Sequence, residues 1–294
     1  AGRVLARKWR RPAIEMFPTF ASGDRFLFSR AIGERFAADI DPGHPALVEY
    51  FAWLTELLSV HDLADVSVED FLAPADESNL VFLPWEFQLA NEGFDDRHTF
   101  VGPCLAGPEP DIWSPPGTDP VALVSLGTTS NHHPDFFRQC AAAFEDLPWH
   151  VVCTHGGGVE PGELGRLPRN VEVHRWLPHT AVLPYASVFV SQAGMGSVMQ
   201  ALHFGVPQVM VPYLPEQQFI AERAVELGLG LAVRKENISP SVLRDAVLAT
   251  ARDETVRAAV RDMRGHIKAA GGTARAADVV EARLRTGLAM AHMR

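Results

Sequence analysis

The sequence predicts an α/β protein with a doubly wound parallel sheet. Three observations favour this fold class. From residue 121 onward, short apolar runs alternate with stretches whose apolar residues recur every three or four positions, as in parallel strands separated by helices. Glycines follow one of these runs and open the next helix. The chain has 294 residues, which is enough for two domains of ordinary size.

The most informative stretch of the chain contains two strands and two helices. Its expected elements are a buried strand over Ser187–Ser191, a glycine turn around Gly194, a helix that ends at Gly205, a strand over Gln208–Tyr213 and a helix that ends at Gly228. This order of strand, turn, helix, strand and helix is typical of an open parallel sheet.

The glycine turn after Ser191 is suited to binding an anion. Glycines let backbone N–H groups come close to a ligand, and the following helix adds unpaired donors and the positive end of its dipole. Ser197 adds a hydroxyl donor, so a diphosphate fits this turn. A turn without a ligand explains the glycines equally well, because short glycine motifs recur by chance.

Shorter elements are expected in the first part of the chain. They are the end of a helix over Gly2–Trp9, a strand over Pro12–Phe17, a helix over Pro45–Val60 and strands over Asn79–Leu83 and Thr99–Val101. The apolar side of the helix over Pro45–Val60 either packs against its neighbours or forms a wall for a hydrophobic ligand.

A segment rich in Pro and Gly, without apolar periodicity, separates the two halves of the chain and predicts a linker. The expected parts are an N-terminal domain over 1–105, a linker over 106–120, a second α/β domain over 121–272 and a C-terminal helix over 273–294. Two-domain proteins often bind ligands in the cleft between their domains.

Composition and charge argue against several classes of protein. The net charge of −10 disfavours general nucleic-acid binding and docking on anionic lipid. No apolar run is long enough to span a bilayer, and the N-terminus lacks the apolar segment of a signal peptide. Cys104, Cys140 and Cys153 are scattered and odd in number, which disfavours a disulfide framework and favours the cytoplasm.

No metal site is expected. Residues 39–41, Asp-Ile-Asp, match a motif that can hold a divalent ion against a diphosphate. They precede a Pro-Gly turn, however, and a solvated helix end explains them better. His132, His133 and His155 have no partner at a recognised metal-binding spacing, so we expect them to be loop residues.

The stretch His174–Gln217 resembles the donor-sugar signature of the macrolide-type and plant-type nucleotide-sugar glycosyltransferases, which form glycosyltransferase family 1 and have the GT-B fold. It begins with His-Arg-Trp-Leu-Pro-His and ends with an acidic residue followed by Gln, and a weaker likeness extends from Arg3 to Leu284. The resemblance implies two Rossmann-like domains that face a cleft.

The resemblance also implies that the N-terminal domain is incomplete. A family member would begin with a strand, a glycine loop and a His, whereas this sequence opens inside a helix-like segment. The chain is then part of a longer protein or a naturally short homologue. The family's catalytic base is that early His, which would lie upstream of Ala1, so we assign no catalytic residue.

On the donor side, the resemblance implies that Trp176 stacks on the nucleobase, that Gly194–Ser197 holds the diphosphate, and that Glu216 and Gln217 contact the sugar hydroxyls. Residues 124–129, Val-Ser-Leu-Gly-Thr-Thr, resemble the family's first strand and loop of the donor domain. The expected donor-binding residues are Ser125, Gly127, Thr128, Trp176, Leu177, His179, Gln192, Gly194, Met195, Gly196, Ser197, Gln200, Glu216 and Gln217.

On the acceptor side, the family lines the cleft with the region that contains Phe26, Phe28 and Phe51, and we expect these three residues to contact the acceptor. The expected partners are a nucleotide-sugar donor and a small hydrophobic acceptor. A further partner is also expected. It is either a second copy of the chain, which would give a homodimer, or the missing N-terminal segment.

Three positions depart from the family pattern. Gln192 replaces a His that contacts the phosphate, Gln200 replaces a Glu that binds the ribose hydroxyls, and His179 replaces a Gln beside the base. Glutamine keeps hydrogen-bonding capacity but carries no charge. These differences leave the fold assignment intact and leave the identity of the donor open.

The resemblance predicts an inverting, metal-independent enzyme without a cofactor. It would move a hexose from a UDP- or dTDP-sugar to a hydroxyl of a macrolide, another polyketide or a phenolic compound. One alternative is a non-catalytic homologue that binds a nucleotide or a partner enzyme. A nucleotide-sugar epimerase shares the architecture, but the sequence has no signature of its catalytic acids.

Overall fold

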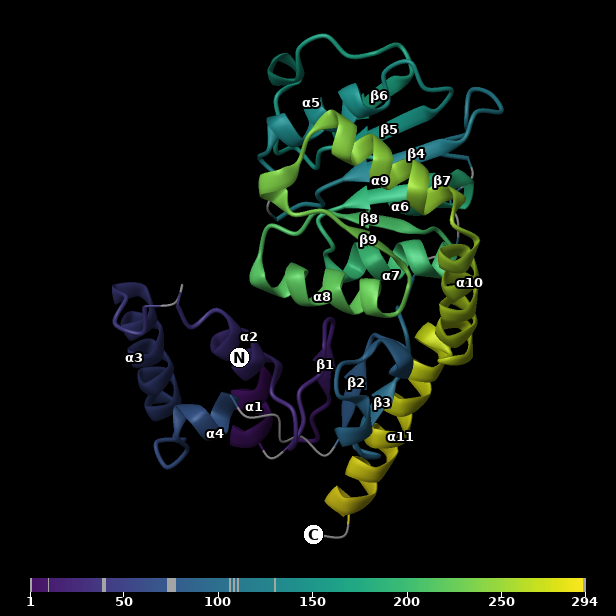
Figure 1. Ribbon diagram of the computed structural model, residues 1–294. Helices are drawn as coiled ribbons and strands as arrows, with labels where there is room; N and C mark the ends of the chain where they lie inside the picture. Colours follow the sequence, from purple (N-terminus) through teal and green to yellow (C-terminus); the bar gives the residue numbers. More distant parts are fainter. Residues whose placement is uncertain are drawn as a thin grey trace. The chain divides into compact units, whose positions relative to one another are not determined.

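The structure, a computed structural model, describes residues 2–9, 11–38, 41–72, 78–105, 107, 109, 111–129 and 131–292. Residues 39 and 40 of the Asp-Ile-Asp segment therefore lie outside the described residues. Contacts divide the chain into two units (Figure 1). Unit 1 comprises Ala1–Phe82, Gln88–Val101 and Thr273–Arg294, and unit 2 comprises Leu83–Phe87 and Gly102–Gly272.

Unit 1 contains a parallel sheet of three short strands in the order β1-β2-β3. The strands are β1 (Glu15–Phe17), β2 (Asn79–Val81) and β3 (His98–Phe100). The helices that begin in this part of the chain are α1 (Gly2–Lys8), α2 (Phe28–Arg35), α3 (Pro45–Val60) and α4 (Val68–Leu72). Most of the final helix, α11 (Gly272–His292), also groups with unit 1.

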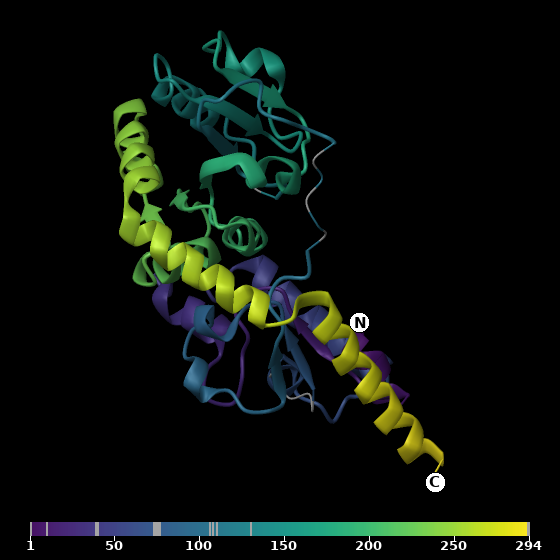
Figure 2. The same ribbon diagram turned by 90° about the vertical axis from the view of Figure 1, so that its right-hand side faces the viewer.

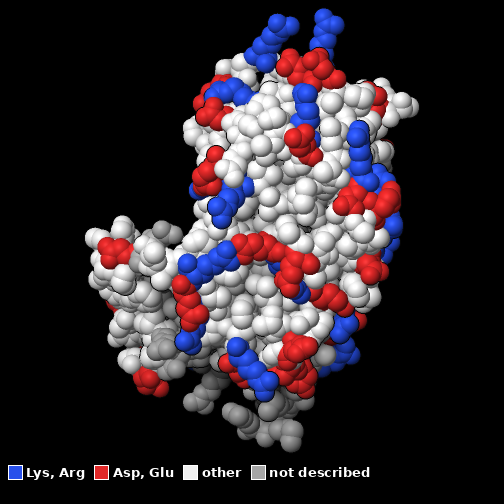
Figure 3. Space-filling model, in the orientation of Figure 1, with Lys and Arg blue, Asp and Glu red and all other residues white. Residues whose placement is uncertain are grey.

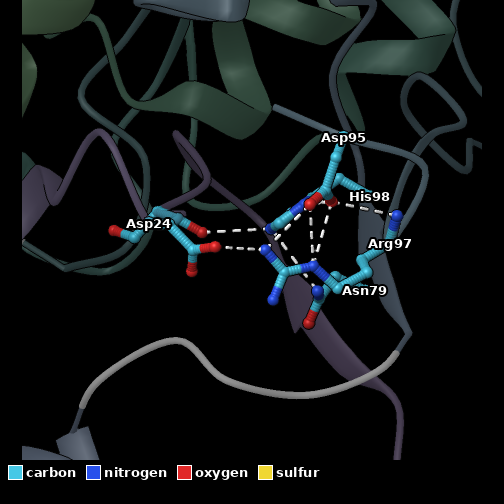
Figure 4. A network of polar contacts seen from close by, with 6 residues as sticks. Asp24, Asn79, Asp95, Arg97 and His98 are labelled. Atoms are coloured by element: carbon cyan, nitrogen blue, oxygen red, sulfur yellow. Dashed lines mark hydrogen bonds and ion pairs between the residues drawn. The ribbon is translucent and has the colours of Figure 1, made fainter. Parts of the chain in front are cut away.

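A polar network fixes the loop before α2 to the start of β3 (Figure 4). The Arg97 guanidinium lies 2.5 Å from the carboxylate of Asp24 and 2.8 Å from that of Asp95. Its hydrogen bond to Asp95 lowers the pKa of that carboxyl to about 2. His98 Nε2 lies 3.2 Å from the carbonyl oxygen of Ser22. The network therefore positions the segment that leads to Phe26 and Phe28.

Unit 2 is built on a six-stranded parallel sheet in the order β6-β5-β4-β7-β8-β9. The strands are β4 (Val121–Ser125), β5 (His150–Thr154), β6 (Val171–His174), β7 (Ala186–Ser191), β8 (Gln208–Met210) and β9 (Gly230–Ala232). β4 is buried at every position because both faces of the sheet are covered.

Helices cover both faces of this sheet (Figure 2). One core joins β4 residues such as Val124 to apolar side chains of α5 (Pro134–Ala143) and α9 (Pro240–Arg252). The core on the opposite face joins Leu123 and Phe189 to α6 (His179–Val182) and α7 (Met195–Phe204). The remaining helices are α8 (Pro215–Glu226), which contacts β9, and α10 (Glu254–Ala269), which contacts α7. This is the doubly wound arrangement that the sequence predicts.

Two boundaries in unit 2 differ from the sequence-based expectation. The strand expected over Gln208–Tyr213 ends at Met210, because its ladder with β9 ends at the pair Met210 and Ala232. β9 itself was not predicted. It is a three-residue edge strand in which Leu231 and Ala232 are exposed, so it has no apolar pattern that sequence periodicity could detect.

The loop after β5 packs closely against the loop that follows β4. The side-chain amide of Asn131 donates to the carbonyl oxygens of Gly127 and His155, at 3.0 and 2.9 Å. Gly156 lies against this bridge with a φ of +60°, and a Cβ atom on it would come within 2.5 Å of the Gly127 oxygen. Glycine is therefore required at Gly156 both for its backbone conformation and for space.

Gly156→Ala is expected to lower the free energy of unfolding by about 1–3 kcal/mol, since the alanine would be strained at this φ and would push the loop away from β4. Urea denaturation measures the change. Gly162→Ala is the matched control, because a Cβ there meets nothing within 4 Å. Equal stability of the two variants would show that the loop adjusts without cost.

Candidate functional site

The strands of unit 2 end together at one edge of the sheet, and this edge contains the point where the chain order reverses. β4 lies at the centre, with β5 and β6 on one side and β7, β8 and β9 on the other. Ligands of doubly wound proteins bind in the crevice beyond the carboxyl ends of the strands at such a reversal. The loops after β4 and β7 are therefore the place to look for a site.

A pocket of about 330 Å³ lies at this edge. It is lined by Ser125, Gly127, Thr128, Thr154, Gly156, Trp176, Leu177, Pro178, His179, Thr180, Gly196, Ser197 and Gln200. None of these lining residues is an Asp, Glu, Lys or Arg. A larger open hollow of about 960 Å³ lies between α5 and residues 164–170, at the amino edge of the sheet. We assign the site to the smaller pocket because it contains the strand ends and the glycine turn.

The turn between β7 and α7 leaves backbone donors unpaired. Ala193 has a φ of +63°, an uncommon conformation for a residue other than glycine, and its N–H bonds to the Ser191 hydroxyl at 3.1 Å. Gly194 caps α7 without a side chain, and the first helical bond runs from the Val198 N–H to the Gly194 oxygen. The N–H groups of the first turn therefore have no acceptor within the helix, which suits them to an anion.

Gln192 follows β7 as the first residue of this turn and is only 6% exposed. Its amide nitrogen donates to the carbonyl oxygen of Leu126, at the end of β4. Its amide oxygen is buried and has no hydrogen-bond partner among the described residues. The side chain thus joins β7 to β4, and one of its two amide hydrogens is already used.

His179 and Gln200 form a hydrogen-bonded pair in the wall of the pocket. His179 Nδ1 lies 3.1 Å from the Gln200 oxygen, and Nε2 lies 3.4 Å from the Thr154 hydroxyl. Burial lowers the pKa of His179, with the Gln200 bond opposing that shift. The imidazole is therefore held neutral, with one N–H and one acceptor nitrogen.

Trp176 and Leu177 differ sharply in exposure although they are adjacent. The Trp176 side chain is 67% exposed at the rim of the pocket, whereas Leu177 is 8% exposed and packs in the core with Val182 and Phe189. A lone Trp is more often a core residue. The exposure of Trp176 leaves its ring free to stack on a planar ligand.

The pocket brings together nine of the fourteen predicted donor residues and leaves five outside its lining. Those outside are Gln192, Gly194, Met195, Glu216 and Gln217. The Gln217 oxygen accepts from the N–H groups of Tyr213 and Leu214, at 2.9 and 3.0 Å, and so fixes the start of α8, while Glu216 is exposed.

Sequence analysis missed four residues that line the pocket. They are Thr154, Gly156, Pro178 and Thr180. Thr154 could have been found because it ends the apolar run that forms β5, and parallel sheets present ligand contacts at the carboxyl ends of their strands. The other three line the pocket only because their loops fold back over the carboxyl edge of the sheet, which the sequence does not show.

The three predicted acceptor residues have different environments in unit 1. Phe28 is only 6% exposed and packs edge-on against Phe20 at 5.1 Å, so its ring fills the core. Phe26 is partly exposed, at 6.5 Å from Phe94. Phe51 is exposed on α3 beside Tyr50.

Charge is mixed over the face shown in Figure 3, where acidic and basic side chains are interspersed. Among the residues that the structure describes, no group of three His, Cys, Asp or Glu side chains is placed to hold a metal ion. Within the same described ranges, every helix is too short or too polar to cross a bilayer.

A doubly wound sheet with an uncapped helix start at its reversal point is the arrangement in which many nucleotide-binding domains hold their ligand. Comparisons with known proteins identify the family. Residues 144–282 match the family described as erythromycin biosynthesis protein CIII-like, C-terminal domain. NDP-glycosyltransferase YjiC of Bacillus licheniformis is 38% identical over 96% of this chain and 69% of its own length. Demethyllactenocin mycarosyltransferase of Streptomyces fradiae is 38% identical over 95% of this chain and 60% of its own.

A solved structure extends the likeness to the fold. The crystal structure of CalG4, the calicheamicin glycosyltransferase, superposes with a TM-score of 0.83 at 41% identity, covering 96% of this chain and 70% of that one. The chain belongs to family 1 of the nucleotide-sugar glycosyltransferases, which have the GT-B fold. It is an enzyme that transfers a sugar, and the family and fold predicted from the sequence are confirmed.

Proposed function

We propose that the protein transfers a hexose from a UDP- or dTDP-sugar to a hydroxyl of a small apolar natural product in the cytoplasm, with inversion and without a metal or cofactor. One observation carries the proposal: a single pocket joins the exposed ring of Trp176 to the uncapped start of α7. The names of the relatives, which include a mycarosyltransferase and a calicheamicin glycosyltransferase, support the class of acceptor.

The pocket can hold the base, the pentose and the diphosphate of a nucleoside diphosphate side by side. The base stacks on Trp176, the diphosphate accepts from the N–H groups of Gly196 and Ser197, and the pentose lies between them beside Gln200. Thr128 supplies a further hydroxyl at the phosphate end. Glu216 and Gln217 lie outside this pocket, at the start of α8, which is consistent with contacts to the transferred sugar.

The transfer itself is one displacement. The acceptor hydroxyl forms a bond to the anomeric carbon and loses its proton to a base, while the bond from that carbon to the diphosphate breaks. Negative charge develops on the leaving diphosphate, where the α7 N-terminus and the Ser197 hydroxyl stabilise it. We assign no residue of this chain to the base. Phe26 and Phe51 remain the proposed acceptor contacts.

A second function is a homologue that binds a nucleotide or a partner without catalysis. The specific observation in its favour is Gln192, whose amide nitrogen bonds to Leu126 instead of being wholly free for a phosphate. In this alternative the pocket is retained, but the protein does not catalyse sugar transfer.

Calorimetry with nucleoside diphosphates, followed by turnover of UDP- and dTDP-hexoses with a panel of macrolide and phenolic acceptors, tests the proposal. We expect binding and formation of an inverted glycoside. Binding without transfer for any donor and acceptor would support the non-catalytic homologue. Absence of nucleotide binding would contradict the proposed transfer, and would leave the non-catalytic homologue only as a protein that binds a partner.

A further inference from the structure

The segment predicted as a linker, residues 106–120, is attached to unit 2. Its described residues group with that unit by their contacts, although the segment is rich in Pro and Gly. Glu109 forms a hydrogen bond with Thr180, which lies 71 positions further along the chain. Trp113 forms one with Glu172, 59 positions further along. The segment therefore packs against the domain that contains the pocket.

Trp113 anchors the segment on the outer strands of the six-stranded sheet. Its indole N–H donates to the Glu172 carboxylate on β6 at 2.6 Å. The indole ring stacks on His150 at the start of β5, with centroids 6.0 Å apart and planes at 25°, and meets Tyr185 at 5.9 Å and 64°. An aromatic ring that has contacts on two sides and a bonded N–H has little freedom to move. The backbone is thus held four residues beyond Glu109.

Glu109 reaches the wall of the donor pocket from outside. Its carboxylate accepts from the Thr180 hydroxyl at 2.9 Å, and Thr180 is a lining residue with only 7% of its surface exposed. Hydrogen bonds to a charged acceptor are about twice as strong as those between neutral groups. A hydroxyl has one hydrogen, so this bond points the Thr180 O–H toward Glu109 and leaves only its lone pairs for a ligand.

The helix that carries Thr180 depends on such contacts. α6 has only four residues, and a helix of one turn gains too little from its own hydrogen bonds to offset the ordering of its backbone. Its N-cap, Pro178, makes no side-chain cap bond. Pro178, His179 and Thr180 all line the pocket, so the placement of α6 decides the shape of this wall.

We propose that Glu109 is a positioning residue of the donor pocket and that Trp113 holds it in place. The inference rests on the proposed function, because it concerns the pocket that would bind the nucleotide. Glu109 is not among the lining residues and acts through Thr180, whose hydroxyl it orients and whose helix it fixes. Without the carboxylate, the buried hydroxyl loses its acceptor and turns or shifts to find another. Nucleotide affinity therefore depends on the predicted linker.

Isothermal titration of Glu109→Ala with UDP and dTDP tests the proposal. We expect about fivefold weaker binding of both, because the pocket wall loses one charge-assisted bond. Glu109→Gln should bind within about twofold of wild type, since its amide oxygen accepts from the same hydroxyl. Asp111→Ala is the matched control: it removes an exposed carboxylate two residues further along and should change nothing. Wild-type affinity in Glu109→Ala, or an equal loss in Glu109→Gln, would overturn the proposal.

A double-mutant cycle tests whether Glu109 acts through Thr180. Thr180→Val keeps the shape of the side chain and removes the hydroxyl. If the bond carries the effect, Glu109→Ala should cost no further affinity in the Thr180→Val background. A fivefold loss in that background as well would show that Glu109 acts on the nucleotide by another route, and would overturn the positioning role.

Trp113→Phe tests the anchor in the same way. Phenylalanine keeps a ring against His150 and removes the N–H that donates to Glu172. We expect about a twofold loss of nucleotide affinity in the wild-type background and none in the Glu109→Ala background. Equal losses in both backgrounds would show that Trp113 does not act through Glu109.

The outcomes separate this inference from the proposed function. If neither nucleotide binds the wild-type protein, the proposed function fails and the inference fails with it. If both bind wild type and Glu109→Ala equally, only the inference fails. Melting curves show that each variant is folded. Glu109→Met keeps the length of the side chain without an acceptor and gives the same expected loss, so it decides the question where the alanine variant does not fold.

Discussion

Replacing Gln192 by Glu is expected to weaken binding of a nucleoside diphosphate more than about a hundredfold at pH 8. The side chain is 6% exposed and belongs to the turn that leads into α7, so a carboxylate there would be close to a diphosphate bound at the α7 N-terminus, with little solvent between the two charges. It would also place an acceptor against the Leu126 oxygen, where the wild-type amide donates. Calorimetry with dTDP and UDP measures the loss.

Lowering the pH should restore part of this affinity. A buried carboxyl has a raised pKa, and its protonated form is neutral and can donate to Leu126 as the amide does. Gln192→Met is the matched control, because it removes the hydrogen bond without adding charge and should lose far less affinity. If the Glu and Met variants bind the diphosphate equally at pH 8, Gln192 is not near the phosphates.

Trp176→Ala is expected to weaken nucleotide binding about ten- to hundredfold while leaving the melting temperature within about a degree of wild type. Stacking of an aromatic ring on a base contributes about 1–3 kcal/mol. The ring is 67% exposed, so its removal creates no cavity in the core. Calorimetry and a thermal melt of the same sample check both parts.

Trp53→Ala is the control for Trp176→Ala, since Trp53 is 56% exposed and lies on α3 in unit 1. It should leave the affinity for nucleotide unchanged. Unchanged affinity in a folded Trp176→Ala protein would show that the base lies elsewhere, and a large fall in melting temperature would assign the ring to packing.

The sheet of unit 2 and its glycine turn could be predicted because their signals are local. The runs that became β4 and β7 are continuous and apolar, as strands buried on both faces must be. Gly205 has a φ of +79° at the end of α7, the conformation that makes glycine a helix terminator. Edge strand β9 could not be predicted, because only one of its three residues is buried and its sequence therefore shows no apolar pattern.

The hydrogen bonds of the site could not be predicted from sequence. Sequence identified Gln192, His179 and Gln200 as departures from the family pattern, but not that Gln192 would bond to Leu126 or that His179 would occupy the Gln200 oxygen. These bonds join residues 21 and 66 positions apart, and they depend on the packing of neighbouring loops. The chemistry offered to a ligand is therefore set by tertiary contacts, although the residue types are visible in the sequence.

The crystal structure of the protein with a nucleoside diphosphate is the most direct test of the central claim, that the pocket at the carboxyl edge of the six-stranded sheet holds the sugar donor. We predict the base against Trp176 and the phosphate oxygens within hydrogen-bonding distance of the Gly196 and Ser197 N–H groups. A diphosphate bound elsewhere, with the α7 N-terminus left to solvent, would contradict the account.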